Sequence, residues 1–520
     1  NDGTIPPDFL RQMFYTLGDY RDILFGDTTM IDTLKKSGDK DMLQREQNIK
    51  EAIDKILNSG NKEPSDEQRK TWWGDFAQYI WNGMICALTY TDSEKKDGKP
   101  QHNESVKKAF FGENNTDNPV TTSTQNGSPR LPTGTTGNTE GTYEKTYKYD
   151  IVKLDENSGT GDPLNNPKLK EFVEIPTFFR YLHEWGQNFC KERKKRLKQI
   201  KVDCRGDENT NRSNDGDGFN CEQIVPDKDV FWGDFIGSSC ATSCRYYRKW
   251  INTKKAEYEK QEKIYVHQKA IAKNNKNDSA FSRTLDTYTT AGDFLENLKN
   301  GPCSKINSGE DNGNGNEEDK LNFRQPNVTF RPATDCKPCS LNELKCNSDV
   351  CGGNTKRKCD GKTDISAEDI ETMGQPTEDI GMLVSDNSTT EIKDEGLKEA
   401  CKDADIFKGI RKDEWKCGKF CDVDVCVLEN FNKDIHDKKN VLIRTLFKRW
   451  LEYFLQDYIK INAKFSHCTN NGEGFACKNK CKDKCKCVEH WINQKRTQWG
   501  KIKERFFKQY NVTDSNDYNA

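Results

Sequence analysis

The pair His183-Glu184 is the first point at which the sequence could carry catalysis. It begins like the motif His-Glu-x-x-His, in which two histidines on one face of a helix bind zinc. The position of the second histidine is occupied by Gln187, so one ligand is missing. The 6 histidines are scattered over 520 residues and suggest no Cys–His or Ser–His pairing. The residues therefore predict neither a zinc protease nor a nucleophilic active site.

A second candidate site is the stretch NRSNDGDGFNCE, from Asn211 to Glu222. Its acidic residues and its glycine fall where a twelve-residue calcium loop needs oxygen ligands and a sharp turn. Asn211, however, stands where such a loop has its first aspartate. Cys204 and Cys221 could instead hold the stretch covalently, and we favour this interpretation as a disulfide-bounded surface loop.

The 21 cysteines could bind zinc or form disulfides. Five fall between Cys336 and Cys359, but without the two-by-two spacing of a zinc ribbon. Others share a helical stripe, as Cys417 and Cys421 would, which suits bridges from a helix to its neighbours. So many cysteines are typical of an oxidising, extracellular compartment, so we expect disulfides and no metal or other cofactor. The number of cysteines is odd, so at least one of the 21 is unpaired, and the sequence leaves the pairing of the others open. The cysteines expected in disulfides are Cys190, Cys204, Cys221, Cys240, Cys244, Cys336, Cys339, Cys346, Cys351, Cys359, Cys401, Cys417, Cys421, Cys426, Cys468, Cys477, Cys481, Cys485 and Cys487.

Two basic stretches raise the question of polyanion binding. Seven of the eleven residues from Lys191 to Lys201 are Lys or Arg, and Lys478 to Lys508 holds eleven bases against three acids. Such runs could bind a sulfated glycan, but the solvated face of a helix explains each run equally well. The net charge of -2 shows that acids elsewhere balance them, so we expect no nucleic-acid partner.

The amino-acid composition lies close to that of chains that are too polar to form a folded core. Apolar residues make up 32% and charged residues another 32%, values that approach those of disordered chains. The 26 Phe, 17 Tyr and 10 Trp, together with the cysteines, favour modest cores stapled by disulfides. The sequence has no apolar run long enough to span a membrane and no secretory leader, so we expect an excised ectodomain whose anchor and sorting signal lie outside it.

Helices are predicted wherever large apolar residues recur at steps of three and four. The clearest begins at Pro176, with Phe178, Leu182 and Trp185 on one face. A capping box, Ser65-Asp-Glu-Gln68, opens another. Helices are predicted over 7–25, 31–57, 65–88, 175–204, 227–273, 282–298, 441–465 and 488–510, the last two as an antiparallel pair joined by a Cys-rich turn.

Polar composition marks the places where the chain changes domain. The stretch 91–141 is rich in Asn, Gly, Thr and Ser and predicts a long excursion, and 301–331 predicts a domain boundary. Alternating residues from Tyr143 to Leu154 predict a short pair of strands.

Several long motifs, in a consistent order, resemble one family. They are WWGDFAQYIWNGMICAL, IPTFFRYLHEWGQNFC, DVFWGDFIGSSCATSCRYYRKWI, GIRKDEWKCGKFC and LFKRWLEYFLQDY. Together they resemble the Duffy-binding-like domains, and more narrowly the adhesion modules of the malaria parasite's erythrocyte membrane protein one. PPDFLRQMFYTLGDYRDI and EDIGMLVSDNSTTE resemble most the beta class of these domains.

The resemblance implies a mostly α fold with little β, made of helical bundles stapled by disulfides and joined by long polar loops. It implies three subdomains: 1–160 (mixed, and incomplete at its N-terminus), 161–331 (a helical bundle) and 332–520 (helical and Cys-rich). It also implies no catalysis, and display on infected erythrocytes as part of a larger membrane-anchored protein. The implied partner is a host endothelial receptor. Intercellular adhesion molecule one, an immunoglobulin-like protein that beta-class members often bind through the third subdomain, is the expected candidate. A sulfated glycan such as chondroitin or heparan sulfate is the alternative, and the excised domain is expected to be a monomer.

The receptor site is predicted within 380–392 and the neighbouring helix 441–465, partly from the resemblance and partly from an apolar run in a polar linker. The receptor-binding residues are predicted to be Ile380, Met382, Leu383, Val384 and Asp386. Exposed apolar groups beside polar ones are what an interface anchor requires. The alternative is that Leu383 and Val384 pin the linker onto the helices beneath.

Overall fold

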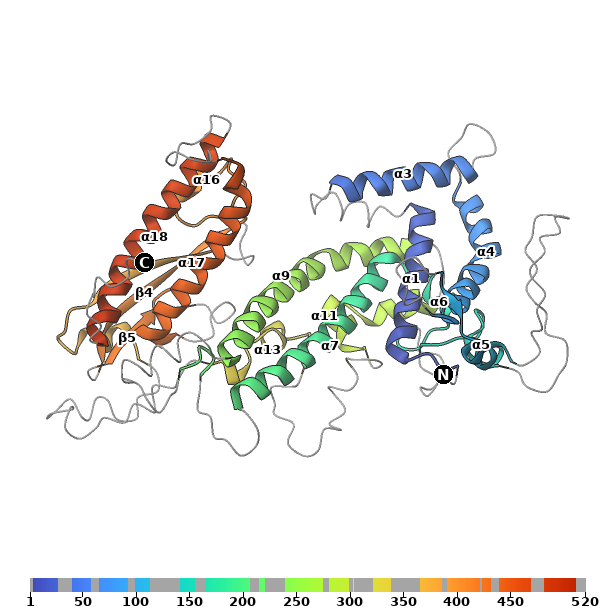
Figure 1. Cartoon of the computed structure of the whole chain (residues 1–520), viewed down its shortest axis with the longest axis horizontal. Coiled ribbons are helices and arrows are strands. Elements are labelled where there is room, and N and C mark those ends of the chain that lie inside the picture. Colours follow the sequence, from blue (N-terminus) through green and yellow to red (C-terminus); the bar gives the residue numbers. More distant parts are fainter. Residues whose placement is uncertain are drawn as a thin grey trace. The chain divides into compact units, whose positions relative to one another are not determined.

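A computed structural model divides the chain into two compact units, whose elements are shown in Figure 1. The first unit comprises Asn1–Lys191 and Gln261–Asn314, and the second comprises Glu192–Lys260 and Gly315–Ala520. The structure describes residues 3–26, 40–57, 65–91, 99–112, 141–154, 164–205, 215–219, 239–274, 280–298, 303, 321–337, 365–385, 391–420, 423–431, 439–468 and 481–510. The predicted fold class, mostly helical with few strands, is confirmed. The division into three subdomains stays a prediction.

The first unit consists mainly of helices whose ends follow from the local sequence. α1 (Pro7–Phe25) begins with proline in its first turn and ends at Gly26, whose φ of 63° is a left-handed conformation that glycine adopts readily. α4 (Asp66–Ala87) begins at the predicted capping box, because the side chains of Ser65 and Gln68 accept each other's backbone N–H. The other elements are α3 (Lys40–Leu57), β1 (Tyr90–Thr91), β2 (Gln101–His102), α5 (Glu104–Phe111), a π-helical turn (Tyr143–Tyr147), α6 (Leu169–Phe172), the first part of α7 (Thr177–Arg205), the last part of α9 (Ser239–Asn274), α10 (Ala280–Thr284) and α11 (Ala291–Glu296).

Aromatic rings fill the core of the first unit. The ring of Phe14 in α1 lies edge-on to Trp81 of α4 and 5.6 Å from the ring of Phe172 in α6. Arg180 of α7 is also buried and forms an ion pair with Asp22 of α1. A charge removed from water needs such a partner, so this pair ties α1 to α7 at the centre of the unit.

Two expectations for the first unit are corrected by the structure. The segment predicted as a strand pair, Tyr143 to Leu154, begins with the π-helical turn, because Tyr143 and Tyr147 point back onto the α5 rings Phe111 and Phe110. The predicted helix 282–298 is divided into α10 and α11. Thr290 accepts the backbone N–H of Asp293 and so begins a new helix within the predicted one.

His183 is fully buried in this unit and is held in its neutral form. Its Nδ1 lies 2.5 Å from the Tyr15 hydroxyl, and burial lowers the pKa of His183 to about 3, with a further contribution from the Arg11 charge. Burial raises the pKa of Tyr15 well above its usual value, so the phenol keeps its proton and donates to the imidazole.

We expect the first unit to lose stability on acidification because of this histidine. Its pKa is lower in the folded than in the unfolded chain, so the unfolded chain binds the extra proton below about pH 6.5. The contribution of His183 to the free energy of unfolding should fall by about 2 kcal/mol between pH 7 and pH 5. His183→Gln, which can still accept from Tyr15, should remove this part of the pH dependence in urea titrations. An unchanged slope in the variant would contradict the assignment.

The second unit contains a four-stranded antiparallel sheet in the order β3-β4-β5-β6, with two long helices on one face. Its core is built where the helices meet the sheet, and includes Ile380, Trp415, Leu446 and Phe506. The opposite face of β5 packs its valines against α15 residue Ile370. The elements are α13 (Pro326–Thr329), a 3₁₀ turn (Thr334–Cys336), α15 (Ala367–Glu371), β3 (Glu378–Ser385), α16 (Glu395–Cys401), β4 (Ile410–Phe420), β5 (Val423–Leu428), β6 (Asn440–Leu442), α17 (Ile443–Phe465) and α18 (Lys482–Gln509), besides parts of α7 and α9.

The predicted antiparallel pair of helices at the end of the chain is present as α17 and α18. Phe447 stacks on Phe506 with ring centroids 4.1 Å apart, and Phe454 stacks on Trp491 at 5.4 Å. Between them the indole N–H of Trp450 donates to Gln498. Contacts that run forward along one helix and backward along the other define the antiparallel arrangement visible in Figure 1.

Disulfides staple both units. The resolved pairs are Cys190–Cys303, Cys204–Cys240, Cys244–Cys336, Cys401–Cys487, Cys417–Cys426 and Cys468–Cys481, and Cys485 is also disulfide-bonded. Cys303 was not among the expected cysteines, and Cys417 lies on strand β4 and not on a helix. Cys86 is a free thiol among the described cysteines. Cys221, Cys339, Cys346, Cys351, Cys359, Cys421 and Cys477 lie outside the described residues.

None of the helices that the structure describes is long and apolar enough to cross a membrane.

Candidate adhesion surface

Four of the five residues predicted to bind a receptor lie on β3 and are buried. Ile380, Met382, Leu383 and Val384 are each at most 2% exposed. Asp386 lies outside the described residues. The expected exposure of this run is therefore wrong, because the two faces of β3 pack into two different cores. Burial agrees with the alternative that Leu383 and Val384 pin the segment onto the helices beneath it. A role of these residues in receptor binding stays a prediction.

β3 is an edge strand whose outer side is held by lysines of α18. Cys417 and Cys426 face each other directly on β4 and β5 with Cα atoms 4.0 Å apart, the spacing of a non-hydrogen-bonded pair. The backbone N–H and C=O of Cys417 therefore point to β3, where they face Glu378. The backbone groups of the even-numbered residues of β3 thus face β4, and those of the odd-numbered residues point away from the sheet. Lys495 and Lys501 donate to the outward carbonyls of residues 383 and 379 at 2.6 and 2.7 Å. Charged side chains on an edge discourage pairing with a further strand.

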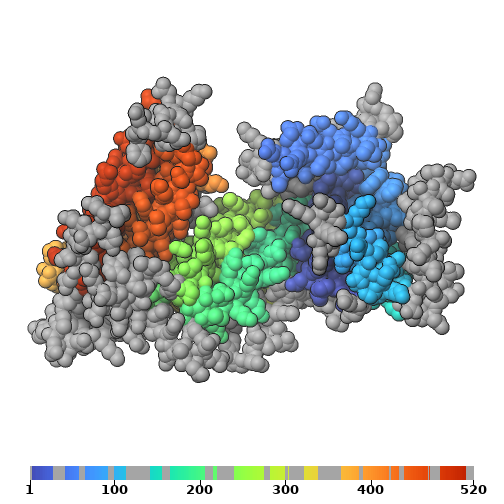
Figure 2. Space-filling view, viewed as in Figure 1, coloured from blue at the N-terminus to red at the C-terminus, as the bar shows by residue number. Residues whose placement is uncertain are grey.

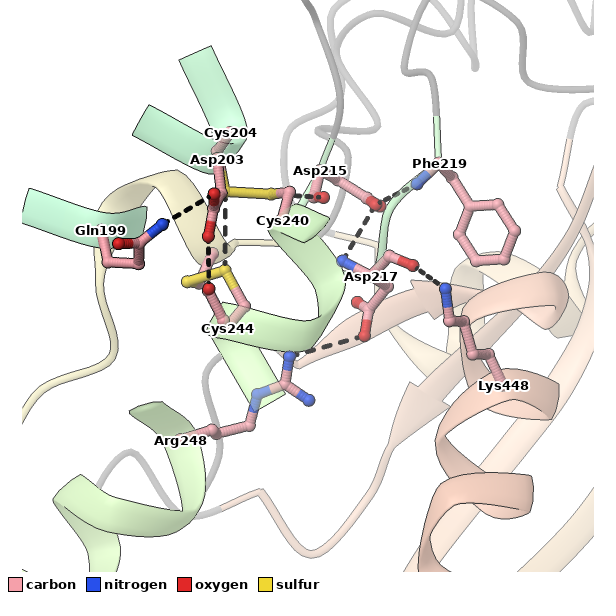
Figure 3. The surroundings of a disulfide bond; sticks show 12 residues. Gln199, Asp203, Cys204, Asp215, Asp217, Phe219, Cys240, Cys244, Arg248 and Lys448 are labelled. Carbon is pink, nitrogen blue, oxygen red and sulfur yellow. Dashed lines mark hydrogen bonds and ion pairs between the residues drawn. A yellow bond between two sulfur atoms is a disulfide. The ribbon is translucent and has the colours of Figure 1, made fainter. Parts of the chain in front are cut away.

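The outer face of α17 differs between its two halves, and the loop 215–219 covers the first half. Figure 3 shows this loop beside the disulfide Cys204–Cys240. The Phe219 ring is 1% exposed, and the Arg444 guanidinium and the Lys448 ammonium of α17 lie over it at 4.8 and 5.0 Å. Burial lowers the pKa of Lys448, whose ammonium donates to the backbone carbonyl of Asp217.

Asp217 joins three elements of the second unit. Its carboxylate accepts from Arg449 of α17 at 3.2 and 3.1 Å and lies 3.5 Å from Arg248 of α9 (Figure 3). The Asp215 carboxylate accepts the backbone N–H groups of residues 217 and 219. Both carboxylates thus bind protein groups, and these contacts hold the loop in shape. Gly216 passes so close that an added Cβ would lie 2.0 Å from the Cys336 carbonyl oxygen.

The cysteines beside this loop form disulfides in place of a metal site. The sulfurs of Cys204, Cys240 and Cys244 lie within 4.8 Å of one another, which is close enough for three metal ligands. All three are disulfide-bonded, however, whereas a metal ligand has to be a thiolate. Cys204, predicted to form a disulfide at one end of this loop, pairs with Cys240. Cys221, predicted to hold its other end, lies outside the described residues.

The second half of the outer face of α17 is open and apolar. Beyond Glu452, whose pKa is raised by burial, Leu455, Tyr458 and Ile459 are 49%, 53% and 66% exposed. These positions are three and four residues apart, so the side chains share one helical face. We call these three residues the α17 patch. Figure 2 shows α17 (orange) with uncovered surface in this view.

Polar groups border the α17 patch on the side of β3. The Lys460 ammonium donates to the Ser385 hydroxyl at 2.6 Å and lies 3.6 Å from the Asp457 carboxylate. Ser385 also hydrogen-bonds Asp457, so the end of β3 is fixed beside the patch. An apolar centre with a polar rim is the anatomy of a protein interface. The patch therefore lies on the predicted helix 441–465 and next to, but not on, the predicted residues of β3.

Helix 441–465 was included in the predicted receptor site, but the residues of the α17 patch were not named, because only the apolar residues of the inner face were counted. In α17, large apolar residues occur at 446, 447, 450, 454 and 461 toward the core, and again at 455, 458 and 459. A helix that is apolar on more than one side either is buried all round or has a partner. The second group of apolar residues in this helix was therefore the sequence signal that could have indicated a binding surface.

Comparison with known proteins agrees with this architecture. Four family models match successive stretches of the chain: the Duffy binding domain over 1–149, the C-terminal subdomain of the Duffy-binding-like domain over 184–334, the Cysteine-Rich Interdomain Region 1 gamma over 377–430, and the PFEMP1 DBL domain over 446–520. The interdomain-region match, which covers β3 to β5, was not anticipated. No curated protein matches the chain.

One solved structure shares the fold. It is the N-terminal NTS-DBL1-alpha and CIDR-gamma double domain of the PfEMP1 protein from the varO strain of Plasmodium falciparum, with 24% identity and a TM-score of 0.50. The match covers 99% of this chain and 66% of that one. The fold is thus that of a disulfide-stapled Duffy-binding-like domain. The chain belongs to the Duffy-binding-like adhesin family of PfEMP1, a family of binding domains and not of enzymes.

Proposed function

We propose that this chain is an extracellular cell-adhesion domain, displayed on infected erythrocytes as part of a larger membrane-anchored protein. Its partner in this proposal is an immunoglobulin-like host receptor, with intercellular adhesion molecule one as the first candidate. The receptor is proposed from the resemblance of 6–23 and 378–391 to the beta class of these domains. The division into 1–160, 161–331 and 332–520 is proposed on the same ground.

The observation that supports adhesion to a protein is the α17 patch. Exposed leucine, tyrosine and isoleucine side chains on one helical face offer an anchor that a partner would desolvate on binding. The bordering Lys460 and Ser385 offer a polar rim. The helix itself is rigidly held, because its inner face stacks on α18 and its first half is locked by Asp217. A rigid anchor loses little conformational freedom on binding, which favours affinity.

A sulfated glycan remains the second candidate because of α7. Lys194, Lys198 and Lys201 are exposed and fall on one face of that helix at spacings of four and three. Such a row can contact successive sulfates, and its affinity would be mainly electrostatic.

Binding at two salt concentrations separates the two candidates. We expect the chain to bind an immobilised receptor ectodomain with an affinity that changes less than about threefold between 0.1 and 0.5 M NaCl, because burial of apolar surface is little screened. Heparin-type glycan, measured in parallel, should bind weakly and be released by the higher salt. Tight, salt-sensitive glycan binding without receptor binding would contradict the proposal and favour the lysine row of α7.

A further inference from the structure

The first unit holds an apolar cavity that is distant in sequence from the α17 patch and has no part in the proposed adhesion. It is lined by residues of α1, α3 and α4, and α3 lies across the other two in Figure 1. The cavity measures about 550 Å³, within the range of small-molecule sites. Its lining residues are Tyr20, Ile23, Leu24, Ile53, Ile56, Leu57, Trp72, Trp73, Ile80, Gly83, Met84 and Ala87.

None of the described lining residues carries a charged side chain, and the cavity is open to solvent. Ile56 is 79% exposed and Tyr20 is 47% exposed, so apolar surface that could be buried faces water. Gly83 lies on the wall formed by α4, and a Cβ placed there would have no atom within 4 Å. This part of the wall is therefore empty space and not a packed helix contact.

A second hollow of about 410 Å³ continues the first, because both are lined by Ile56, Leu57 and Trp72. Among the described residues that line the two hollows, Glu67 and Asp75 carry the charges, and both are negative. Asp75 forms no ion pair with any other described residue, while Glu67 shares its charge with the exposed Lys70 at 3.2 Å. The Trp72 ring, stacked on Phe76 at 4.8 Å, lies one helical turn from Asp75.

We propose that this site binds a single-chain cationic amphiphile, with an alkyl tail in the larger hollow and a quaternary ammonium head in the smaller one. The tail is recognised by the aliphatic and aromatic lining, which gains from every methylene removed from water. The head is recognised by the carboxylates of Asp75 and Glu67 and by the face of Trp72, the combination that binds quaternary ammonium ions through charge and cation–π attraction. An anionic head would meet two like charges, and no cation among the described lining residues.

Calorimetric titration of the whole chain with dodecyltrimethylammonium, below its micelle-forming concentration, tests the proposal. We expect one saturable site with a dissociation constant on the order of 10–100 µM. Decyltrimethylammonium, which is two methylenes shorter, should bind about 16-fold more weakly, since each methylene contributes about fourfold. Dodecanoate, with the same tail length and an anionic head, should bind at least tenfold more weakly than the cationic probe.

A pair of glycine variants identifies the site. Gly83→Leu should fill the cavity and abolish binding, while Gly74→Leu, on the same helix and also with no atom within 4 Å of its Cβ position but outside both linings, should bind as the parent does. Both variants replace a helical glycine and should raise the melting temperature slightly, so loss of binding cannot be ascribed to unfolding. Equal binding by the two variants would overturn the site.

A charge variant tests the head group. Asp75→Asn should weaken the cationic probe about threefold to tenfold and leave the affinity for dodecanoate the same or higher, whereas Asp66→Asn, on the same helix but outside the linings, should change neither. If dodecanoate binds the parent as tightly as dodecyltrimethylammonium does, the ligand class is overturned. If no saturable binding of the cationic probe is observed, the whole proposal is overturned.

Discussion

Replacing Leu383 with aspartate is expected to lower the free energy of unfolding of the second unit by about 4 kcal/mol, which corresponds to a fall of roughly 10 °C in melting temperature. Leu383 is 2% exposed and packs in a core with Leu397, Ile461, Val488 and Trp491. A carboxylate there would lose the apolar contacts of leucine and would be removed from water. The backbone carbonyl of residue 383 accepts a hydrogen bond from Lys495 of α18. The substitution therefore disturbs the contact between β3 and α18 as well.

Two further variants control this experiment. Leu383→Ala adds no charge and should still cost about 3 kcal/mol, because the cavity it leaves lies between α16, α17 and α18. Leu455→Asp makes the same chemical change on the open face of α17 and should shift stability by less than about 1 kcal/mol. Thermal unfolding followed by circular dichroism measures all three. If Leu383→Asp unfolds like the parent but no longer binds a receptor, the original interpretation of this run as an exposed anchor is correct.

The helical part of the fold was predictable because local signals define helices. Proline at the start of α1 and glycine after its end place both ends at the predicted residues. The capping box fixes the beginning of α4 in the same way. The apolar faces of α17 and α18 repeat at three and four residues over several turns, and so predicted their pairing.

The sheet was missed because its strands do not show the alternation of a half-exposed strand. β3 carries apolar residues at 380, 382, 383 and 384, since both of its faces are covered, and such a run cannot be distinguished by period from a linker anchor. In β5 all six residues are buried, yet Asp424 is among them and pairs with Arg505 at 2.9 Å. Tertiary partners of this kind are not visible in the sequence.

Disulfide pairing was also beyond sequence reasoning. Cys190 pairs with Cys303, which is 113 residues away and was left out of the expected set, and Cys244 pairs with Cys336 across 92 residues. The spacing of cysteines restricts their pairing only weakly, because the chain between them can take any path that brings the two sulfurs together. The sequence likewise does not show that the apolar residues of β3 are buried while those of the α17 patch are exposed, because the tertiary fold decides which face of each element is covered.

Aspartate at Ile459 is the second large effect that we expect. Ile459 is the most exposed member of the α17 patch, at 66%, so its replacement leaves folding unchanged. In a complex the side chain would be desolvated, and a carboxylate would be placed against an apolar partner surface. A central anchor of this kind contributes about 2–3 kcal/mol to affinity, so Ile459→Asp should weaken receptor binding about 30-fold to 100-fold.

Ile492 provides a matched control on the neighbouring helix. It is 41% exposed on α18 and lies outside the patch, so Ile492→Asp makes the same substitution on an exposed helical surface of the same unit. Equal melting temperatures of the two variants and the parent would show that any difference in binding is not a difference in folding.

The most direct test of adhesion through the α17 patch is the dissociation constant of the receptor ectodomain for the parent, for Ile459→Asp and for Ile492→Asp, measured by surface plasmon resonance at physiological salt. The account predicts that Ile459→Asp weakens binding at least 30-fold while Ile492→Asp binds within about twofold of the parent. Undiminished binding by a folded Ile459→Asp variant, or an equal loss in both variants, would contradict it.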